Sequence, residues 1–157
     1  MEDKNYFRIV NYRKEFAPYF YDLNIAWLKK HFYVEEYDKE VLSHPEKYIL
    51  DKGGSILFAM LGEKVVGVSA LINRGKDGLE LSKMAVSEDY QGQHIGKKLM
   101  YASITKAIEQ GTHRLFLDSN TLLKPAIQLY KQVGFKEIPV PEDTPYERCN
   151  IRMEILF

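Results

Sequence analysis

The sequence predicts an α/β fold in which one mixed, largely antiparallel sheet carries helices on both faces, within a single domain of residues 1–157. Three observations lead to this prediction. Short runs rich in β-branched and aromatic residues alternate with longer runs of helical period. Two of the short runs are joined by a two-residue turn, which makes them antiparallel neighbours. A later short run leads directly through a glycine loop into a helix, as layered α/β proteins require.

The first elements are a short strand and two helices. Residues 6–10 are predicted to form a strand, and residues 16–31 a helix, because their apolar side chains recur at helical spacing. Those side chains are Phe20, Leu23, Trp27 and Leu28. A second short helix is predicted within residues 38–50, with an interruption near Pro45.

The next segment is predicted to be a β-hairpin followed by a third strand. The runs "SILFAML" at 55–61 and "KVVGVSALI" at 64–72 flank a turn of Gly62 and Glu63. After the loop "NRGKDG", the run "LELSKMAV" at 79–86 is the next predicted strand.

Two helices alternate with strands in the rest of the chain. A helical period runs from Gly96 and stops at Gly111, which suits a C-terminal cap. The run "RLFLDS" at 114–119 predicts a strand, and Pro125 is expected to be the first residue of a helix that Gly134 closes. The last strands are expected at 135–138 and 149–156.

Composition narrows the classes of function. Lys and Arg together number 22, as do Asp and Glu, so no net field favours nucleic acid or an anionic membrane surface. The one cysteine, Cys149, cannot form an internal disulfide. The charged start "MEDKNYFR" does not resemble a signal peptide, and no apolar run approaches the length of a membrane span. These features predict a cytoplasmic protein with no nucleic-acid or membrane partner.

The stretch "YQGQHIGKKL" at 90–99 predicts an anion site. Glycines let the backbone approach a ligand closely, and the start of a helix presents unpaired N–H groups and a partial positive charge. A Walker loop needs four residues between its glycines, but Gly92 and Gly96 have three between them. A dinucleotide loop would need glycine where this chain has His94.

These residues resemble the GNAT family of N-acetyltransferases. "QGQHIG" is similar to the family's pyrophosphate loop, and "NTLLKPAIQLYKQVGF" at 120–135 to its second signature, a helix that ends in Gly-Phe. "ELSKMAVSEDYQGQ" and "GEKVVGVSAL" resemble the strands before the loop in single-domain bacterial members. The resemblance covers about the C-terminal two-thirds of the chain and implies acetyl-CoA as cosubstrate.

The resemblance also implies a set of residues that bind acetyl-CoA. These are Met84, Ala85, Val86, Gln91, Gly92, Gln93, His94, Ile95, Gly96, Lys97, Asn120 and Tyr130. Two positions depart from the family pattern. His94 stands where glycine is usual, so a positive φ there would be strained. Asn120 is expected to serve in place of the asparagine that many members carry at the position of Leu123.

The expected chemistry is direct acetyl transfer to a primary amine. An amine with a pKa near ~10 is a free base in only about one molecule in a thousand at neutral pH, so a base is needed. Glu80 is the candidate, acting through water, with Glu35 and Glu36 as fallback bases. Tyr130 is expected to assist the departing thiolate. The resemblance further implies that a strand bulge within residues 84–86 exposes a backbone N–H to the thioester oxygen.

Each role has a structural alternative. Glu80 would face solvent in an alternating strand, although regular alternation would also put it on the same face as Met84, near the acetyl group. Tyr130 would be a core aromatic, and Lys97 and Lys98 solvated surface charges. The aromatic residues Trp27, Phe32, Tyr33 and Tyr37 line an acceptor pocket or pack in the core. The histidines have no paired metal spacing, so no metal is predicted.

Three functions remain open from sequence alone. A small-molecule amine is favoured as acceptor, because the chain shows no peptide-binding appendage beyond its first two helices. The alternatives are transfer to a protein or peptide, and a CoA-binding module without catalysis. A homodimer is compatible with all three.

Overall fold

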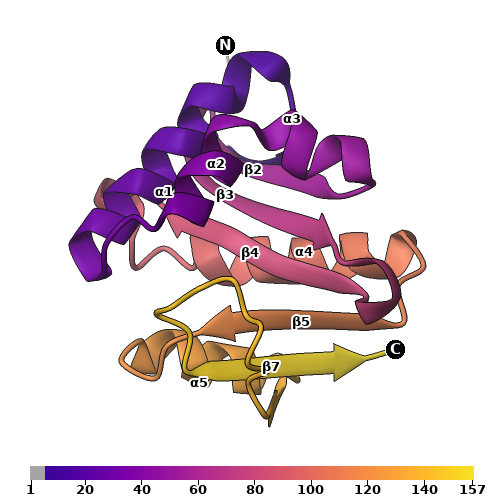
Figure 1. Cartoon of the computed structure of the whole chain (residues 1–157). Coiled ribbons are helices and arrows are strands. Elements are labelled where there is room, and N and C mark those ends of the chain that lie inside the picture. Colours follow the sequence, from indigo (N-terminus) through magenta and orange to yellow (C-terminus); the bar gives the residue numbers. More distant parts are fainter. Residues whose placement is uncertain (1–5) are drawn as a thin grey trace.

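A computed structural model describes residues 6–157, so the first five residues of the predicted domain lie outside it. Its sheet has seven strands in the order β1-β2-β3-β4-β5-β7-β6, and only the β4–β5 pair is parallel. The strands are β1 (Phe7–Asn11), β2 (Ser55–Leu61), β3 (Lys64–Asn73), β4 (Leu79–Val86), β5 (Arg114–Ser119), β6 (Lys136–Ile138) and β7 (Ile151–Leu156). The predicted mixed, mostly antiparallel sheet is confirmed (Figure 1).

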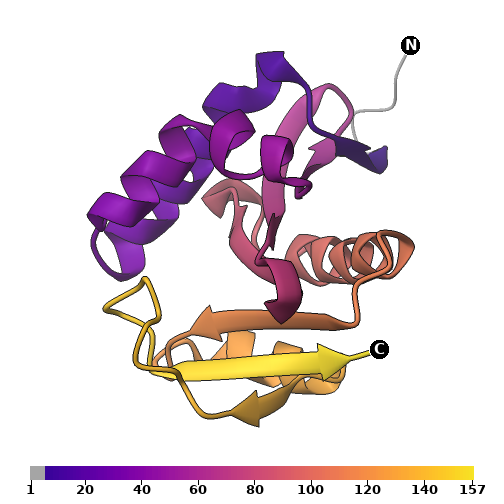
Figure 2. The same ribbon diagram turned by 45° about the vertical axis from the view of Figure 1, so that its right-hand side comes forward.

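Helices cover both faces of this sheet (Figures 1 and 2). On one face lie α1 (Ala17–His31), α2 (Glu36–Ser43) and α3 (Pro45–Tyr48), and on the other lie α4 (Ile95–Glu109) and α5 (Lys124–Gln132). Phe20 and Leu28 of α1 join β2 and β3 side chains in one core cluster. Met100 of α4 and Ile127 of α5 join β4, β5 and β7 side chains in a second. The apolar side chains that recur at helical spacing in the sequence therefore face the sheet.

Several element boundaries differ from the prediction by one or two residues, among them β1, which runs over 7–11 instead of 6–10, and two of these differences have a local cause. Pro125 is the second residue of α5 rather than the first, because Lys124 already has helical geometry. Strand β7 begins at Ile151 rather than Cys149, since the Cys149 N–H closes a turn onto the Tyr146 carbonyl oxygen at 3.3 Å. Among residues 6–157, no helix has the length and apolar character that a bilayer crossing needs.

A β-bulge interrupts β4 in its second half. Ala70 of β3 pairs with Ser82 and Val68 pairs with Ala85, so three steps along β4 match two along β3. Lys83 lies inside the bulge with φ 54°, a left-handed conformation that is uncommon for a residue other than glycine.

The bulge changes which face the later β4 side chains occupy. Glu80 pairs with Ile72, which packs in the cluster under α1, whereas Met84 packs against Ile95 and Leu99 of α4. The expectation that regular alternation puts Glu80 and Met84 on one face was therefore wrong. The extra residue reverses the alternation between them.

Strands β4 and β5 separate soon after they begin to pair. Their parallel register holds only for Leu79 with Leu115 and for Glu80 with Phe116. The two arrows lie close together at one end and diverge toward the other (Figure 1). The sheet therefore opens between its antiparallel halves, and residues of both strands beyond this point line a cavity.

Candidate active site

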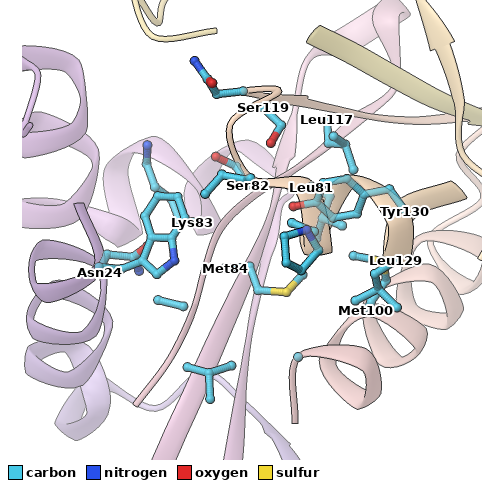
Figure 3. Close-up of a pocket in the computed structure, with 18 of the residues that line it drawn as sticks. Asn24, Leu81, Ser82, Lys83, Met84, Met100, Leu117, Ser119, Leu129 and Tyr130 are labelled. Carbon is cyan, nitrogen blue, oxygen red and sulfur yellow. The ribbon is translucent and has the colours of Figure 1, made fainter. Parts of the chain in front are cut away.

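The cavity between β4 and β5 has a volume of about 670 Å³. Its walls come from α1, β4, the loop before α4, the first turns of α4, the end of β5, α5, and the segment 139–150 that connects β6 to β7. Figure 3 shows side chains of all these strands and helices converging on one space. All the predicted cofactor residues line this cavity except Gln93.

One end of the cavity is built by the glycine loop and the start of α4. Gly92 has φ 84° and His94, the residue before the helix, has φ 61°. The strain expected for a non-glycine residue at His94 is therefore present. No side chain caps the first turn of α4, so its leading N–H groups remain available to a ligand.

This end of the cavity has the character of an anion site. The lining includes Gln91, Gly92, Gly96 and Lys97, so backbone donors, the positive end of the α4 dipole and one lysine charge converge there. Lys98 does not line the cavity, because its ammonium group lies 4.5 Å from the centre of the Phe7 ring. The two lysines therefore have different surroundings.

The middle of the cavity lies between the β4 bulge and α5. Met84 extends into it from one side and Tyr130 from the other, with the phenol oxygen directed toward β4 (Figure 3). The Tyr130 ring is braced edge-on against Phe135 at 6.0 Å between ring centres. Burial raises the pKa of the Tyr130 phenol, and the hydrogen bond with the Ser119 side chain lowers this pKa by a smaller amount. The phenol therefore stays protonated at neutral pH and can donate a hydrogen bond.

Asn120 lines the cavity, but both polar atoms of its side-chain amide are hydrogen-bonded to the protein backbone. Its Nδ2 donates to the Arg148 carbonyl oxygen at 2.8 Å, and its Oδ1 accepts from the Leu122 N–H at 2.9 Å. Asn120 therefore ties the β5–α5 turn to the segment 139–150.

Glu80 is adjacent to the cavity but does not line it. Its side chain is 3% exposed and accepts hydrogen bonds from Nε and Nη2 of Arg74 at 2.9 and 2.7 Å. Burial raises the pKa of Glu80, and the Arg74 charge opposes this rise. Glu80 therefore does not face solvent, as its structural alternative expected, and it does not open into the cavity either.

A buried polar cluster forms the other end of the cavity. Lys83 donates to Asp38 at 2.7 Å, and the Arg148 guanidinium donates to both Asp38 oxygens at 2.6 and 2.8 Å. Tyr146 places its hydroxyl 3.4 Å from the Lys83 nitrogen and 3.3 Å from the Ser82 hydroxyl. Lys83, Ser82, Tyr146 and Arg148 all line the cavity, whereas Asp38 is completely buried behind them.

Burial and the neighbouring charges shift the pKa values of the groups in this cluster. Burial alone would raise the pKa of Asp38, but hydrogen bonds and charge from Arg148 and Lys83 outweigh it and hold the pKa below its ordinary value. Burial lowers the pKa of Lys83 despite the opposing effect of Asp38. Burial raises the pKa of Tyr146 well above its ordinary value, so this phenol also stays protonated.

The two fallback bases have different surroundings. The Glu35 carboxylate caps α2 and also accepts the backbone N–H groups of Glu147 and Arg148, at 2.9 and 3.3 Å. Glu36 is exposed at the first turn of α2. Glu35 therefore holds the segment 139–150 against α2, as the orange-yellow loop next to the purple helices shows (Figures 1 and 2).

The aromatic residues divide between wall and surface. Trp27 lines the cavity from α1 and Phe32 from the position just after this helix, with Asn24 and Leu28 beside them. Tyr33 is exposed and donates to Glu147, and Tyr37 packs edge-on against Tyr146.

The cluster of Asp38, Lys83, Tyr146 and Arg148 is not among the residues predicted from the sequence. A signal was present, because Lys83 interrupts an otherwise mostly apolar strand and a charge there requires a partner. Its partners are 45 and more residues away in sequence, so no local pattern identifies them. Across residues 6–157, no three His, Cys, Asp or Glu side chains are grouped so that they could hold a metal ion.

The fold and site together define an α/β protein with a cavity between two diverging strands and a helix start at one end of that cavity. The model of the acetyltransferase (GNAT) family matches residues 9–135, most of the chain. The chain belongs to this family, and the resemblance found in the sequence is confirmed.

Individual relatives agree with this assignment. The uncharacterized N-acetyltransferase YjgM of Escherichia coli is 33% identical over 88 residues, which cover 55% of this chain and 53% of that protein. A GNAT acetyltransferase structure from Staphylococcus aureus matches with a TM-score of 0.84 at 24% identity, covering 95% of this chain and 98% of that one. A Bacillus subtilis acetyltransferase in complex with CoA matches with a TM-score of 0.72 at 20% identity, covering 97% and 99%. The chain spans about half the length of the curated relatives it matches.

Proposed function

We propose that this protein transfers the acetyl group of acetyl-CoA to the amine of a small molecule, without a covalent enzyme intermediate. The observation that carries this proposal is that one cavity joins the anion site at the start of α4 to a protonated phenol and a buried polar cluster. A long phosphate-bearing thioester could enter at one end and an amine at the other.

The anion end fits the pyrophosphate of acetyl-CoA. Gly92 leaves open space where a side chain would begin, and Gly96 has only Val86 near that point, at 3.9 Å. Backbone donors of the first α4 turn and the Lys97 charge would bind the phosphates. The apolar walls supplied by Ile95 and Leu129 suit the pantetheine arm.

In the proposed reaction, the amine nitrogen attacks the thioester carbon, the C–N bond forms and the C–S bond breaks. The ammonium proton passes through water to Glu80 before the attack, and the nitrogen loses its second proton to water as the C–S bond breaks. The Tyr130 hydroxyl donates a hydrogen bond to the departing sulfur. A backbone N–H of the interrupted segment 84–86 would meet the developing negative charge on the thioester oxygen, an effect typically worth ~3 kcal/mol.

Cys149 lines the cavity, which raises the alternative of an acetylated thiol. Burial and the nearby Asp118 charge raise the pKa of this thiol, so it stays protonated at neutral pH and is a poor nucleophile. This supports direct transfer. A Cys149→Ala variant serves as a control that should keep its activity.

We expect Glu80→Gln to bind acetyl-CoA normally and to lose about 10²-fold in kcat at pH 7. Part of the loss should return at higher pH, where the amine loses its proton unaided. Because the pKa of Glu80 is raised, wild-type activity should fall with decreasing pH at a value above the ordinary glutamate pKa.

Steady-state rates across pH test this expectation. Glu154→Gln is the matched control, because Glu154 is paired with Arg114 at 2.8 Å and does not line the cavity. A Glu80→Gln variant as active as the wild type would remove Glu80 as the base and transfer the role to Glu35 or Glu36.

For Tyr130→Phe we expect a fall in kcat of about tenfold or more with acetyl-CoA affinity nearly unchanged, since the ring packing against Phe135 survives. Tyr101→Phe, on the exposed side of α4, should have no effect. Turnover equal to the wild type would make Tyr130 a packing residue only.

The alternative function, a CoA-binding module, is distinguished by a simple assay. Wild-type protein with acetyl-CoA is offered a panel of small amines and peptides while released thiol is followed. Release that depends on an added small amine supports the proposal. Release with peptides alone supports a protein or peptide acceptor, and acetyl-CoA binding without release supports the module.

A further inference from the structure

The guanidinium group of Arg148 stands at the polar end of the cavity and is held by two carboxylates. Its Nη1 and Nη2 atoms donate to the two oxygens of Asp38 at 2.6 and 2.8 Å, and Nη1 also donates to Glu35 at 2.9 Å. The Arg148 carbon Cζ lies 4.8 Å from the centre of the Tyr146 ring, within the range of a cation–π contact. The orientation of the group is therefore fixed before any ligand arrives.

These contacts leave one edge of the guanidinium unused. An arginine has five N–H groups. One N–H of Nη1 and one of Nη2, which form the end edge of the guanidinium, bind Asp38, and the other N–H of Nη1 binds Glu35. The side edge, made of the Nε–H and the second N–H of Nη2, has no acceptor within residues 6–157. Nε is not sealed from solvent, and the Arg148 side chain is 15% exposed where it lines the cavity.

An open side edge of this kind matches a carboxylate. Two parallel N–H groups in a rigid plane bind both oxygens of a planar carboxylate, which an ammonium group cannot do. A partly exposed donor pair beside a ligand cavity can exchange water for an acceptor atom on a ligand, so the open edge is suited to recognise one.

The charges around Arg148 favour an acceptor with no net charge. Lys83 and Arg148 carry two positive charges, and Asp38 and Glu35 carry two negative charges, so the cluster is balanced. A zwitterion with one carboxylate and one ammonium group keeps that balance. A phosphate dianion would instead add two uncompensated charges beside two carboxylates.

We propose that the acceptor is an amino acid or a similar amino-carboxylate, whose carboxylate binds the Nε–Nη2 edge of Arg148. This rests on the proposed acetyltransferase function and names the substrate class of that same site. The wall made of Trp27 and Leu28 on α1 and of Phe32 just after it receives the apolar part of the molecule.

The first test compares acceptors that differ only at the carboxylate. Phenylalanine, phenylalaninamide and 2-phenylethylamine are assayed with acetyl-CoA, and the leucine series repeats the comparison. We expect kcat/KM for each amino acid to exceed that of its amide and its decarboxylated amine by about 10²-fold. The amide has the less basic amine and is more often unprotonated, so a preference for the acid reports recognition of the carboxylate.

A variant of Arg148 separates recognition from folding. Arg148→Lys keeps the charge but loses the two-donor edge, so the ratio of kcat/KM for acid over amide should fall at least about tenfold. A purely structural role would lower both rates together and leave the ratio unchanged. Arg152→Lys is the control, because Arg152 makes a similar two-bond pair with Asp118 but does not line the cavity.

Binding without turnover gives a second readout. In calorimetry on the wild-type complex with CoA, 3-phenylpropanoate should bind and 3-phenylpropanamide should bind at least about tenfold more weakly. Equal binding of the two, equal rates for acids and amides, or an unchanged ratio in Arg148→Lys would each overturn the inference. If no amine is acetylated, the proposed function is overturned. The calorimetric comparison still tests the carboxylate site in that case, because it does not depend on turnover.

Discussion

Asp38→Asn is expected to lower the free energy of unfolding by about 3 kcal/mol or more at pH 7. Asp38 is completely buried, and its carboxylate holds both Lys83 and Arg148. An amide at this position leaves two cations in the interior without their shared partner, and removing one member of a buried pair costs more than the pair itself contributes. Denaturant unfolding of the two proteins measures the difference.

The pH dependence of this effect follows from the direction of the pKa shift. The pKa of Asp38 is lower in the folded protein than in the unfolded chain. Its contribution to stability is therefore fully present above the ordinary aspartate pKa and is lost as the pH falls through the lowered folded value. The stability difference between wild type and Asp38→Asn should accordingly shrink in acid.

Two further variants make this prediction specific. Asp22→Asn, on the exposed face of α1, should change stability little. Adding Lys83→Met to Asp38→Asn should restore part of the loss, because one of the two unpartnered charges is then gone. A loss of less than about 1 kcal/mol for Asp38→Asn would mean that the cluster does not hold α2 to the sheet as the contacts indicate.

Gly96→Glu is expected to weaken acetyl-CoA binding by about 10²- to 10³-fold. The side chain would start at the edge of the anion site and bring a carboxylate against the phosphates, and such like-charge contacts cost several kcal/mol. Gly92→Pro should also weaken binding strongly, because proline cannot adopt the φ of 84° found at Gly92 and has no N–H.

Matched controls separate charge from backbone effects. A Cβ atom at position 96 would meet only Val86 at 3.9 Å, an ordinary contact, so Gly96→Ala should bind acetyl-CoA far better than Gly96→Glu. Lys98→Ala should have a small effect, since Lys98 packs on Phe7 away from the cavity. Calorimetry that finds unchanged affinity in Gly96→Glu would contradict the assignment of the pyrophosphate to this loop.

Most of the fold could be predicted because the sequence is locally consistent. The hairpin of β2 and β3 has its two-residue turn where Gly62 takes φ 57°, and β4 and β5 have the predicted bounds. The start of α4 follows from the glycine loop. In each case a short-range pattern and the final packing favour the same structure.

Features that depend on distant contacts could not be predicted in the same way. The residue at which a strand bulges depends on its neighbour strand, so regular alternation gave the wrong face for Met84 relative to Glu80. Likewise, the pairing of Glu80 with Arg74 and of Lys83 with Asp38 and Arg148 arises only when α2, β4 and the segment 139–150 meet. Side-chain charge alone does not identify such partners.

In the proposed function, acetyl-CoA bound between β4 and β5 gives its acetyl group directly to an amine. The most direct test mixes wild-type protein, acetyl-CoA and amines of the panel, and measures released CoA and acetylated amine together over one time course, with the intact protein mass recorded in parallel. We expect one acetylated amine for each CoA released, no release without amine, and no acetylated protein. Bound acetyl-CoA with no acetylated product from any amine, or an acetylated enzyme that forms before product, would contradict it.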